Sequence, residues 1–234
     1  MRTVCPQSLK SANPRFAVML NIYLPRPEWF FGVDTTLEAF AGIIALLIAF
    51  VSYKLYRSTN ERSYKYFLAS FVLLGGSFLS RSVADAFLGK FFNVSPNIIG
   101  LVFFGGYVGH IFLALAAYLL LIASTYKIED KRLLVMMFLL LVPGLVFSAS
   151  YFLSFYVLSS ILLLFITWAY SQNYRKVRSV TSALVFGAFI LLTLAQPLFI
   201  LDMRSNIWYV FAHAVQAFAY LMLLAALLRI LLKR

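Results

Sequence analysis

The chain is short of charge, cysteine and histidine. Charged residues make up 12% of its 234 residues, and it has one cysteine, Cys5, and two histidines. A single cysteine excludes an internal disulfide and a cysteine-based metal cluster. The chain also lacks a Walker motif, a Gly-x-Ser-x-Gly elbow and a His-Glu-x-x-His helix. These are the common signatures of ATPases, serine hydrolases and zinc proteases, so no sequence motif indicates an enzyme.

Apolar residues dominate instead, at 63% of the chain, with a mean hydropathy of +0.90. A soluble domain of this length could not cover so much apolar surface, whereas a bilayer removes the need. A spanning helix needs about 20 mostly apolar residues. Seven such runs are present, at 35–56, 64–84, 97–126, 132–149, 151–171, 179–201 and 206–231. The sequence therefore predicts an all-α integral membrane protein, a seven-transmembrane-helix bundle over 35–234, with no room for a soluble catalytic domain.

The net charge of +12 is distributed unevenly between the loops. Thirteen cations lie at the odd-numbered loops and the C-terminal end: Lys54, Arg57, Arg62, Lys65, Lys127, Lys131, Arg132, Arg175, Lys176, Arg178, Arg229, Lys233 and Arg234. The even-numbered loops hold three: Arg81, Lys90 and Arg204. Cytoplasmic loops carry the excess of cations, so the pattern predicts a multi-pass cell-membrane protein with an outside N-terminus and a cytoplasmic C-terminus. The charge then indicates contact with anionic lipid, not nucleic acid.

Residues 1–34 form an N-terminal segment that we expect to be extracytoplasmic or interfacial. Its four cations, Arg2, Lys10, Arg15 and Arg26, oppose an outside location, but the other six segments outweigh them. No apolar core precedes a small-residue cleavage site, so a signal peptide is not expected. A start at Met19 would remove three of these cations. The aromatic stretch 25–31 is typical of an interfacial anchor.

Small residues predict the packing faces of the helices. The first helix carries Gly42, Ala45, Ala49 and Ser52 in one stripe below Glu38, and the second has Gly75-Gly76. The third carries Gly105 and Gly109, four residues apart. In lipid, such residues let helix backbones approach closely. Pro143 and Pro197 fall inside the fourth and sixth helices, where we expect bends.

Polar side chains within the apolar runs form the candidate site. Five of them lie about 16 to 18 residues from the nearest cytoplasmic cation, or roughly 24–27 Å along a helix: Glu38, Arg81, His110, Gln196 and His213. In a hydrocarbon core of about 30 Å this level is the outer leaflet. Gln216 lies one turn deeper than His213, and Asp85 follows Arg81 by four residues, a spacing that permits an ion pair. Polar groups at this depth usually face the bundle interior, although helix ends at the headgroups remain an alternative.

Three kinds of site fit these residues. One is a ligand pocket open to the outside. The second is bis-histidine haem on His110 and His213, with the glycines of 103–109 leaving space for a porphyrin. The third is a metal site formed by both histidines and a carboxylate. A retinal Schiff base is not expected, because the last helix has no lysine between Asn206 and Ile230.

Two segments resemble known membrane proteins. The stretch 53–62, running into 64–69, resembles the turn between the first two helices of archaeal multi-helix membrane proteins, some of which resemble sensor modules that precede histidine kinases. The stretch 213–221, with His213 and Gln216 before an aromatic and leucine run, resembles their final helix. The resemblance implies a sensor or ligand-binding module, and because no output domain follows Arg234, we expect it to act through a partner protein. The alternatives are a haem-binding electron-transfer subunit and a structural subunit of a larger complex.

Overall fold

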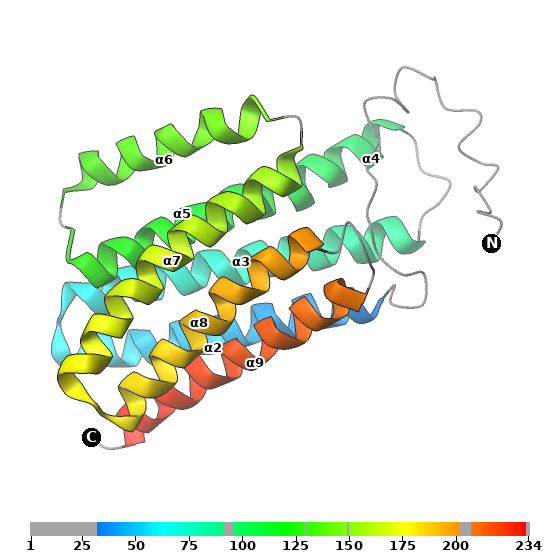
Figure 1. The fold of residues 1–234 in the computed structure, drawn as a ribbon. Helices are drawn as coiled ribbons and strands as arrows, with labels where there is room; N and C mark the ends of the chain where they lie inside the picture. Colours follow the sequence, from blue (N-terminus) through cyan, green and yellow to red (C-terminus); the bar gives the residue numbers. More distant parts are fainter. Residues whose placement is uncertain (1–31, 91–95, 129, 149, 202–206, 233–234) are drawn as a thin grey trace.

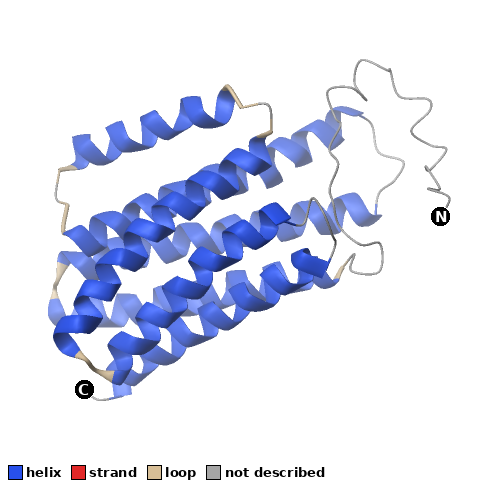
Figure 2. Ribbon diagram, in the orientation of Figure 1, coloured by secondary structure: helices blue, strands red, loops and turns tan. Residues whose placement is uncertain are grey.

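The computed structural model describes residues 32–90, 96–128, 130–148, 150–201 and 207–232, and every regular element in these ranges is helical (Figures 1 and 2). The elements are α2 (Val33–Thr59), α3 (Arg62–Lys90), α4 (Pro96–Phe103), the π-helix η3 (Phe104–Val108), α5 (Gly109–Tyr126), α6 (Lys131–Val146), α7 (Tyr151–Val177), α8 (Val180–Leu201) and α9 (Ile207–Leu232). They match the seven predicted runs closely. The main differences are that α3 and α7 continue into segments predicted as loops.

Six of these helices are arranged in a closed ring, in which each helix packs against two neighbours. Packing runs from α2 to α3, α5, α7, α8 and α9, and then back from α9 to α2. In Figure 1, α6 lies at the edge of the bundle, where it packs against α5 and α7. The interior of the ring is filled by large side chains that are almost fully buried, including Phe71, Tyr118, Leu163, Phe189 and Tyr220.

The outer surface of the bundle is apolar. Large hydrophobic side chains face outward on every long helix, among them Phe50, Leu140, Leu164 and Phe218. The six helices of the ring, with η3 and α5 counted together, are each long and apolar enough to cross a membrane; α6, with 16 residues, is shorter. Apolar faces on the outside of an already packed core are what a bilayer requires, so the chain is a multi-pass membrane protein.

Successive helices run in opposite directions, and this places the turns at two ends (Figure 1). The turn between α2 and α3, the connection from α5 to α6, the turn between α7 and α8 and the end of α9 gather at one end, which we call the cation-rich end. The starts of α2, α7 and α9 lie at the opposite, cation-poor end. Among the described residues, the predicted separation of the cations between the two ends is therefore present in the fold; Arg204, Lys233, Arg234 and residues 1–31 lie outside the described residues.

Three helices end at the cation-rich end in the same way. Asn60, Lys127 and Arg178 follow α2, α5 and α7 with φ of 55°, 54° and 47°, and each donates its backbone N–H to the carbonyl four residues earlier. This left-handed cap satisfies a carbonyl at the end of the helix. Glycine is the usual residue at such a position, so a lysine and an arginine there are unusual.

Glycine contacts confirm one predicted packing face and correct another. An added Cβ on Gly42 would lie 3.3 Å from the carbonyl oxygen of Gly75, and one on Gly75 would lie 2.7 Å from the Leu46 side chain, so α2 and α3 pack closely at these two glycines. Gly76, predicted together with Gly75, does not belong to this face, because an added Cβ there meets nothing within 4 Å. Gly105 and Gly109 do not mark the packing face of their helix. Gly106 does, because its added Cβ would overlap that of Ala84 on α3. The π-turn at 104–108 shifts the helix faces, and a four-residue spacing count assumes a regular helix.

Candidate functional site

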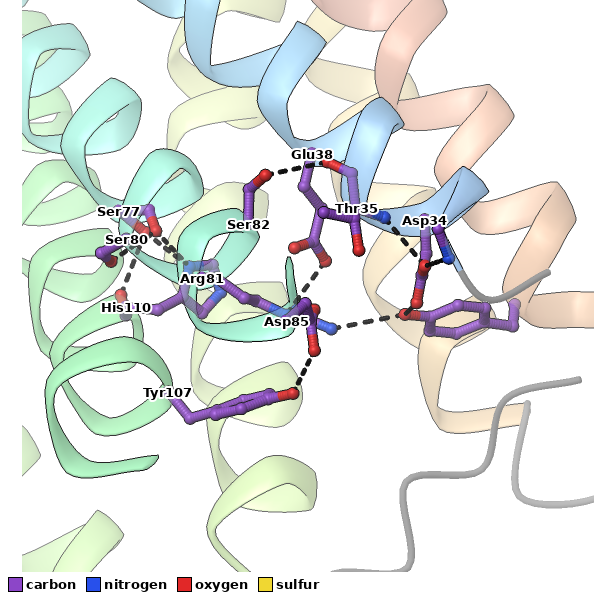
Figure 3. Close-up of polar contacts among 12 residues, drawn as sticks. Asp34, Thr35, Glu38, Ser77, Ser80, Arg81, Ser82, Asp85, Tyr107 and His110 are labelled. Atoms are coloured by element: carbon purple, nitrogen blue, oxygen red, sulfur yellow. Dashed lines mark hydrogen bonds and ion pairs between the residues drawn. The ribbon is translucent and has the colours of Figure 1, made fainter. Parts of the chain in front are cut away.

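A buried ion pair joins α2 to α3 near the cation-poor end. Arg81 Nε lies 2.9 Å from Glu38 Oε1, and both side chains are buried. The close approach of these helices at Gly42 and Gly75, one turn further along α2, brings the two side chains together. Figure 3 shows Arg81 extended between Glu38 and the neighbouring helices. An ion pair in the interior of a membrane bundle is costly to place, and such groups are usually functional.

One branch of the network leads from Arg81 to the starts of α9 and α2. Arg81 Nη2 donates to Tyr209 Oη at 3.4 Å, and Tyr209 Oη donates to Asp34 Oδ2 at 3.5 Å. The other oxygen of Asp34 accepts the backbone N–H groups of Gly32 and Thr35, at 3.0 Å and 2.8 Å. Asp34 thereby satisfies two backbone N–H groups at the start of α2 and is joined to α9 through Tyr209.

A second branch leads from α3 to the π-helix. Tyr107 Oη donates to Asp85 Oδ1, and the Arg81 guanidinium lies 5.9 Å from the centre of the Tyr107 ring. Tyr107 is 1% exposed, so its hydroxyl points inward from η3 (Figure 3). Such π-turns occur often at functional sites, because the extra residue redirects neighbouring side chains. We call Asp34, Glu38, Arg81, Asp85, Tyr107, His110, Tyr209 and His213 the polar cluster.

The two histidines lie inside the ring and are held by different contacts. His110 Nδ1 lies 2.7 Å from Ser77 Oγ, which also donates to the carbonyl of His110 at 3.1 Å. Its ring packs edge-on against Phe155 at 5.4 Å. His213 packs edge-on against Tyr209 at 4.6 Å and Phe199 at 5.0 Å. Aromatic side chains therefore fix the orientation of both imidazoles.

A small cavity lies between these groups. It has a volume of about 20 Å³, which is close to the space that one water molecule needs. Its polar lining comes from all six helices of the ring: Glu38, Arg81, His110, Tyr118, Tyr156, Gln196, His213 and Gln216. Within the described part of the chain, Gln196 Oε1 has no hydrogen-bond partner, so an acceptor is available beside this space.

Six of the seven residues predicted as the candidate site thus line one cavity. The seventh, Asp85, lies one turn away on α3, where it accepts from Tyr107. Sequence reasoning missed Asp34, Ser77, Tyr107 and Tyr209. Asp34 and Tyr209 each precede a predicted site residue by four positions, Glu38 and His213, and this spacing was the available signal. Serine and tyrosine are too common in these helices for either to be distinguished by composition.

The predicted haem and metal sites do not fit this geometry. A porphyrin does not fit in a cavity of about 20 Å³ between histidines whose rings are packed against Phe155, Phe199 and Tyr209. Among the described residues, no three His, Cys, Asp or Glu side chains are grouped to hold a metal ion, so the proposed set of two histidines and a carboxylate does not form.

The chain was also compared with known proteins. No family model, curated protein or solved structure matches it. The resemblance to archaeal sensor modules therefore stays a prediction, and the functional proposal depends on the geometry of the site.

Proposed function

We propose that the chain is a seven-helix sensor module of the cell membrane that acts through a partner protein, with the polar cluster as its responsive site. The observation that carries the proposal is the buried Glu38–Arg81 pair, which lines the small cavity. Arg81 is hydrogen-bonded to Tyr209 and through it to Asp34, and it lies over the ring of Tyr107, which is bonded to Asp85. A change of charge or hydration at this pair alters the contacts of α2, α3, η3 and α9 together.

The orientation is part of this proposal. The N-terminus lies outside and the C-terminus in the cytoplasm, as supported by the gathering of the cations at one end of the bundle. Single cysteines at Lys131 and Arg204, in a Cys5→Ser background, test it by labelling of intact cells with an impermeant thiol reagent. The Arg204 site labels from outside and the Lys131 site is protected. The reverse pattern contradicts the orientation.

The size of the cavity limits what the site detects. A space for about one water molecule admits a proton, a water molecule or a small ion, and excludes a metabolite unless the helices separate. Because the site combines carboxylates, a guanidinium and two imidazoles, we propose that it responds to protonation. Histidine and carboxylate groups supply the charge change that such a response needs.

Tryptophan fluorescence tests this function. Trp208 directly precedes Tyr209, so in a variant with Trp29→Phe and Trp168→Phe its emission reports on the start of α9, which Tyr209 joins to the cluster. In nanodiscs, we expect its emission to change when the cluster gains a proton as the pH is lowered from about 8 to about 4. The double variant Glu38→Gln with Arg81→Met should abolish this titration. Ser52→Ala, which removes a buried hydroxyl bonded to the Ile48 carbonyl outside the cluster, should preserve it.

Two outcomes contradict the sensor proposal. Emission that does not change across this pH range, in a folded protein, removes the cluster as a proton-responsive site. An equal titration in the Glu38→Gln, Arg81→Met variant assigns the response to other groups. Either result favours the structural-subunit alternative, in which the cluster only holds the helices together.

A further inference from the structure

The cation-rich end contains a second cavity, much larger than the first. Its volume is about 800 Å³, within the usual range of small-molecule sites. It lies between α3 and α5 on one side and α7, α8 and α9 on the other. The left-handed caps of α2, α5 and α7 lie at the same end of the bundle. None of the residues of the polar cluster lines it.

The lining of this cavity is amphipathic. Its inner part is apolar and includes Phe67, Val185 and Leu227, of which Phe67 and Leu227 are buried. Its mouth carries the exposed cations Lys127, on the cap of α5, and Lys176, in the last turn of α7. One carboxylate, Glu61, is present among the described lining residues. The lining thus combines an apolar interior with a mouth of net positive charge.

The cavity that holds the two lysines is also lined by hydrogen-bond donors. Hydroxyls of Tyr64, Tyr170 and Thr181 and amides of Gln172 and Asn173 belong to the same lining. The first turn of α8 begins beside them at Val180, and the N-terminus of a 22-residue helix adds partial positive charge. Lysines with hydroxyl and amide donors are suited to a phosphate, and the apolar interior is suited to an acyl chain.

We propose that this cavity binds an anionic phosphate amphiphile, with the phosphate between Lys127 and Lys176 and the apolar tail directed toward Leu227. Two sources share this chemistry: a phospholipid of the adjoining leaflet and a soluble phosphate monoester. We assign the phospholipid, because the cavity lies at a membrane-facing end with cations at headgroup level. The assignment of this leaflet as cytoplasmic depends on the orientation proposed above, whereas the binding site itself does not.

Thermal unfolding in detergent tests the proposal with four separate probes. These are dioleoyl phosphatidylglycerol, dioleoyl phosphatidylcholine, glycerol phosphate and inorganic phosphate. We expect phosphatidylglycerol to raise the melting temperature most. The double variant Lys127→Ala, Lys176→Ala should lower its apparent affinity by about 10- to 30-fold, because two surface cations are lost. The matched control Lys131→Ala, Arg175→Ala removes two cations from the same end but outside the cavity, and should bind as the parent does.

A third variant tests the apolar interior without changing the charge. Val185→Trp fills the cavity from α8 and should weaken phosphatidylglycerol binding while its melting temperature without lipid shows that it folds. An equal loss of affinity in the Lys127→Ala, Lys176→Ala variant and in its control means general attraction between charges and overturns the site, as does the absence of stabilisation by any probe. Equal stabilisation by glycerol phosphate overturns the lipid assignment and gives a soluble ester as the source. None of these outcomes alters the fluorescence titration of the polar cluster.

Discussion

The two cavities of the bundle differ forty-fold in volume, about 20 Å³ against about 800 Å³, although both are lined by charged and polar side chains. In the polar cluster the charges belong to different helices and bind one another, as Glu38 and Arg81 do. At the cation-rich end the lysines are exposed and have the same sign. Opposite charges inside the ring therefore draw helices together, whereas like charges at the end of the ring leave space that water or an anion can occupy.

The largest expected effect comes from breaking the ion pair. Glu38→Gln leaves the Arg81 guanidinium buried without its charge partner, and we expect a loss of about 3–5 kcal/mol in the free energy of unfolding. Glu38→Gln with Arg81→Met removes both charges and should recover most of the loss. Equilibrium unfolding in mixed micelles measures both. If the single variant loses less than about 1 kcal/mol, the ion pair does not hold α2 and α3 together at this end of the ring.

The next effect tests the close contact beside the π-helix. Gly106→Ala places a Cβ on that of Ala84 and should cost about 1–3 kcal/mol by overpacking. Gly105→Ala is the control, since its Cβ meets nothing within 4 Å. Adding Ala84→Gly to Gly106→Ala should restore stability. If Gly105→Ala and Gly106→Ala cost the same, the effect comes from the helix backbone and not from the contact.

A smaller effect is expected at His213. Its replacement by leucine should leave the fold intact and cost only about 0.6 kcal/mol, the average of a polar interaction between membrane helices. The fluorescence titration of Trp208 should be lost or displaced. Melting temperature and titration are measured on the same sample. A full titration in the variant would remove His213 from the responsive site.

The smallest effect on stability is expected at the cation-rich end. Lys127→Ala with Lys176→Ala should change the free energy of unfolding by no more than about 0.5 kcal/mol when lipid is absent, because both side chains are exposed. Chemical unfolding of delipidated protein checks this value. A large loss would mean that the lysines have a structural role, as the residues of the polar cluster do.

Much of the helical framework was predictable from hydropathy alone. The long apolar runs locate the helices to within a few residues, apart from the extended ends of α3 and α7, and counting residues from the cations placed Glu38, His110 and His213 at a common depth. That count works because the rise of a helix is constant. The order of helices around the ring was not predictable. Lipid is as apolar as the interior of the bundle, so the sequence of a helix does not show which of its apolar faces contacts lipid and which contacts another helix.

The parts that sequence reasoning missed depend on contacts between helices. Because of the π-turn, Gly106 faces Ala84 in place of Gly105 or Gly109. No residue pattern in the sequence predicts that turn. The role of Tyr209 follows from α9 lying beside α2, so its bond to Asp34 joins residues 175 positions apart. The large cavity has no signal in any single helix, because it is formed by the ends of five.

The left-handed caps bear on which residues evolution has retained at positions 127 and 178. A non-glycine residue in this conformation costs about 1–2 kcal/mol, so glycine at position 127 should make the protein more stable than lysine does. A protein selected for stability alone would drift toward glycine at both 127 and 178. A lysine and an arginine at these strained positions are what selection for charge at the membrane surface would leave, and laboratory evolution for heat resistance should select against that charge first at these two sites.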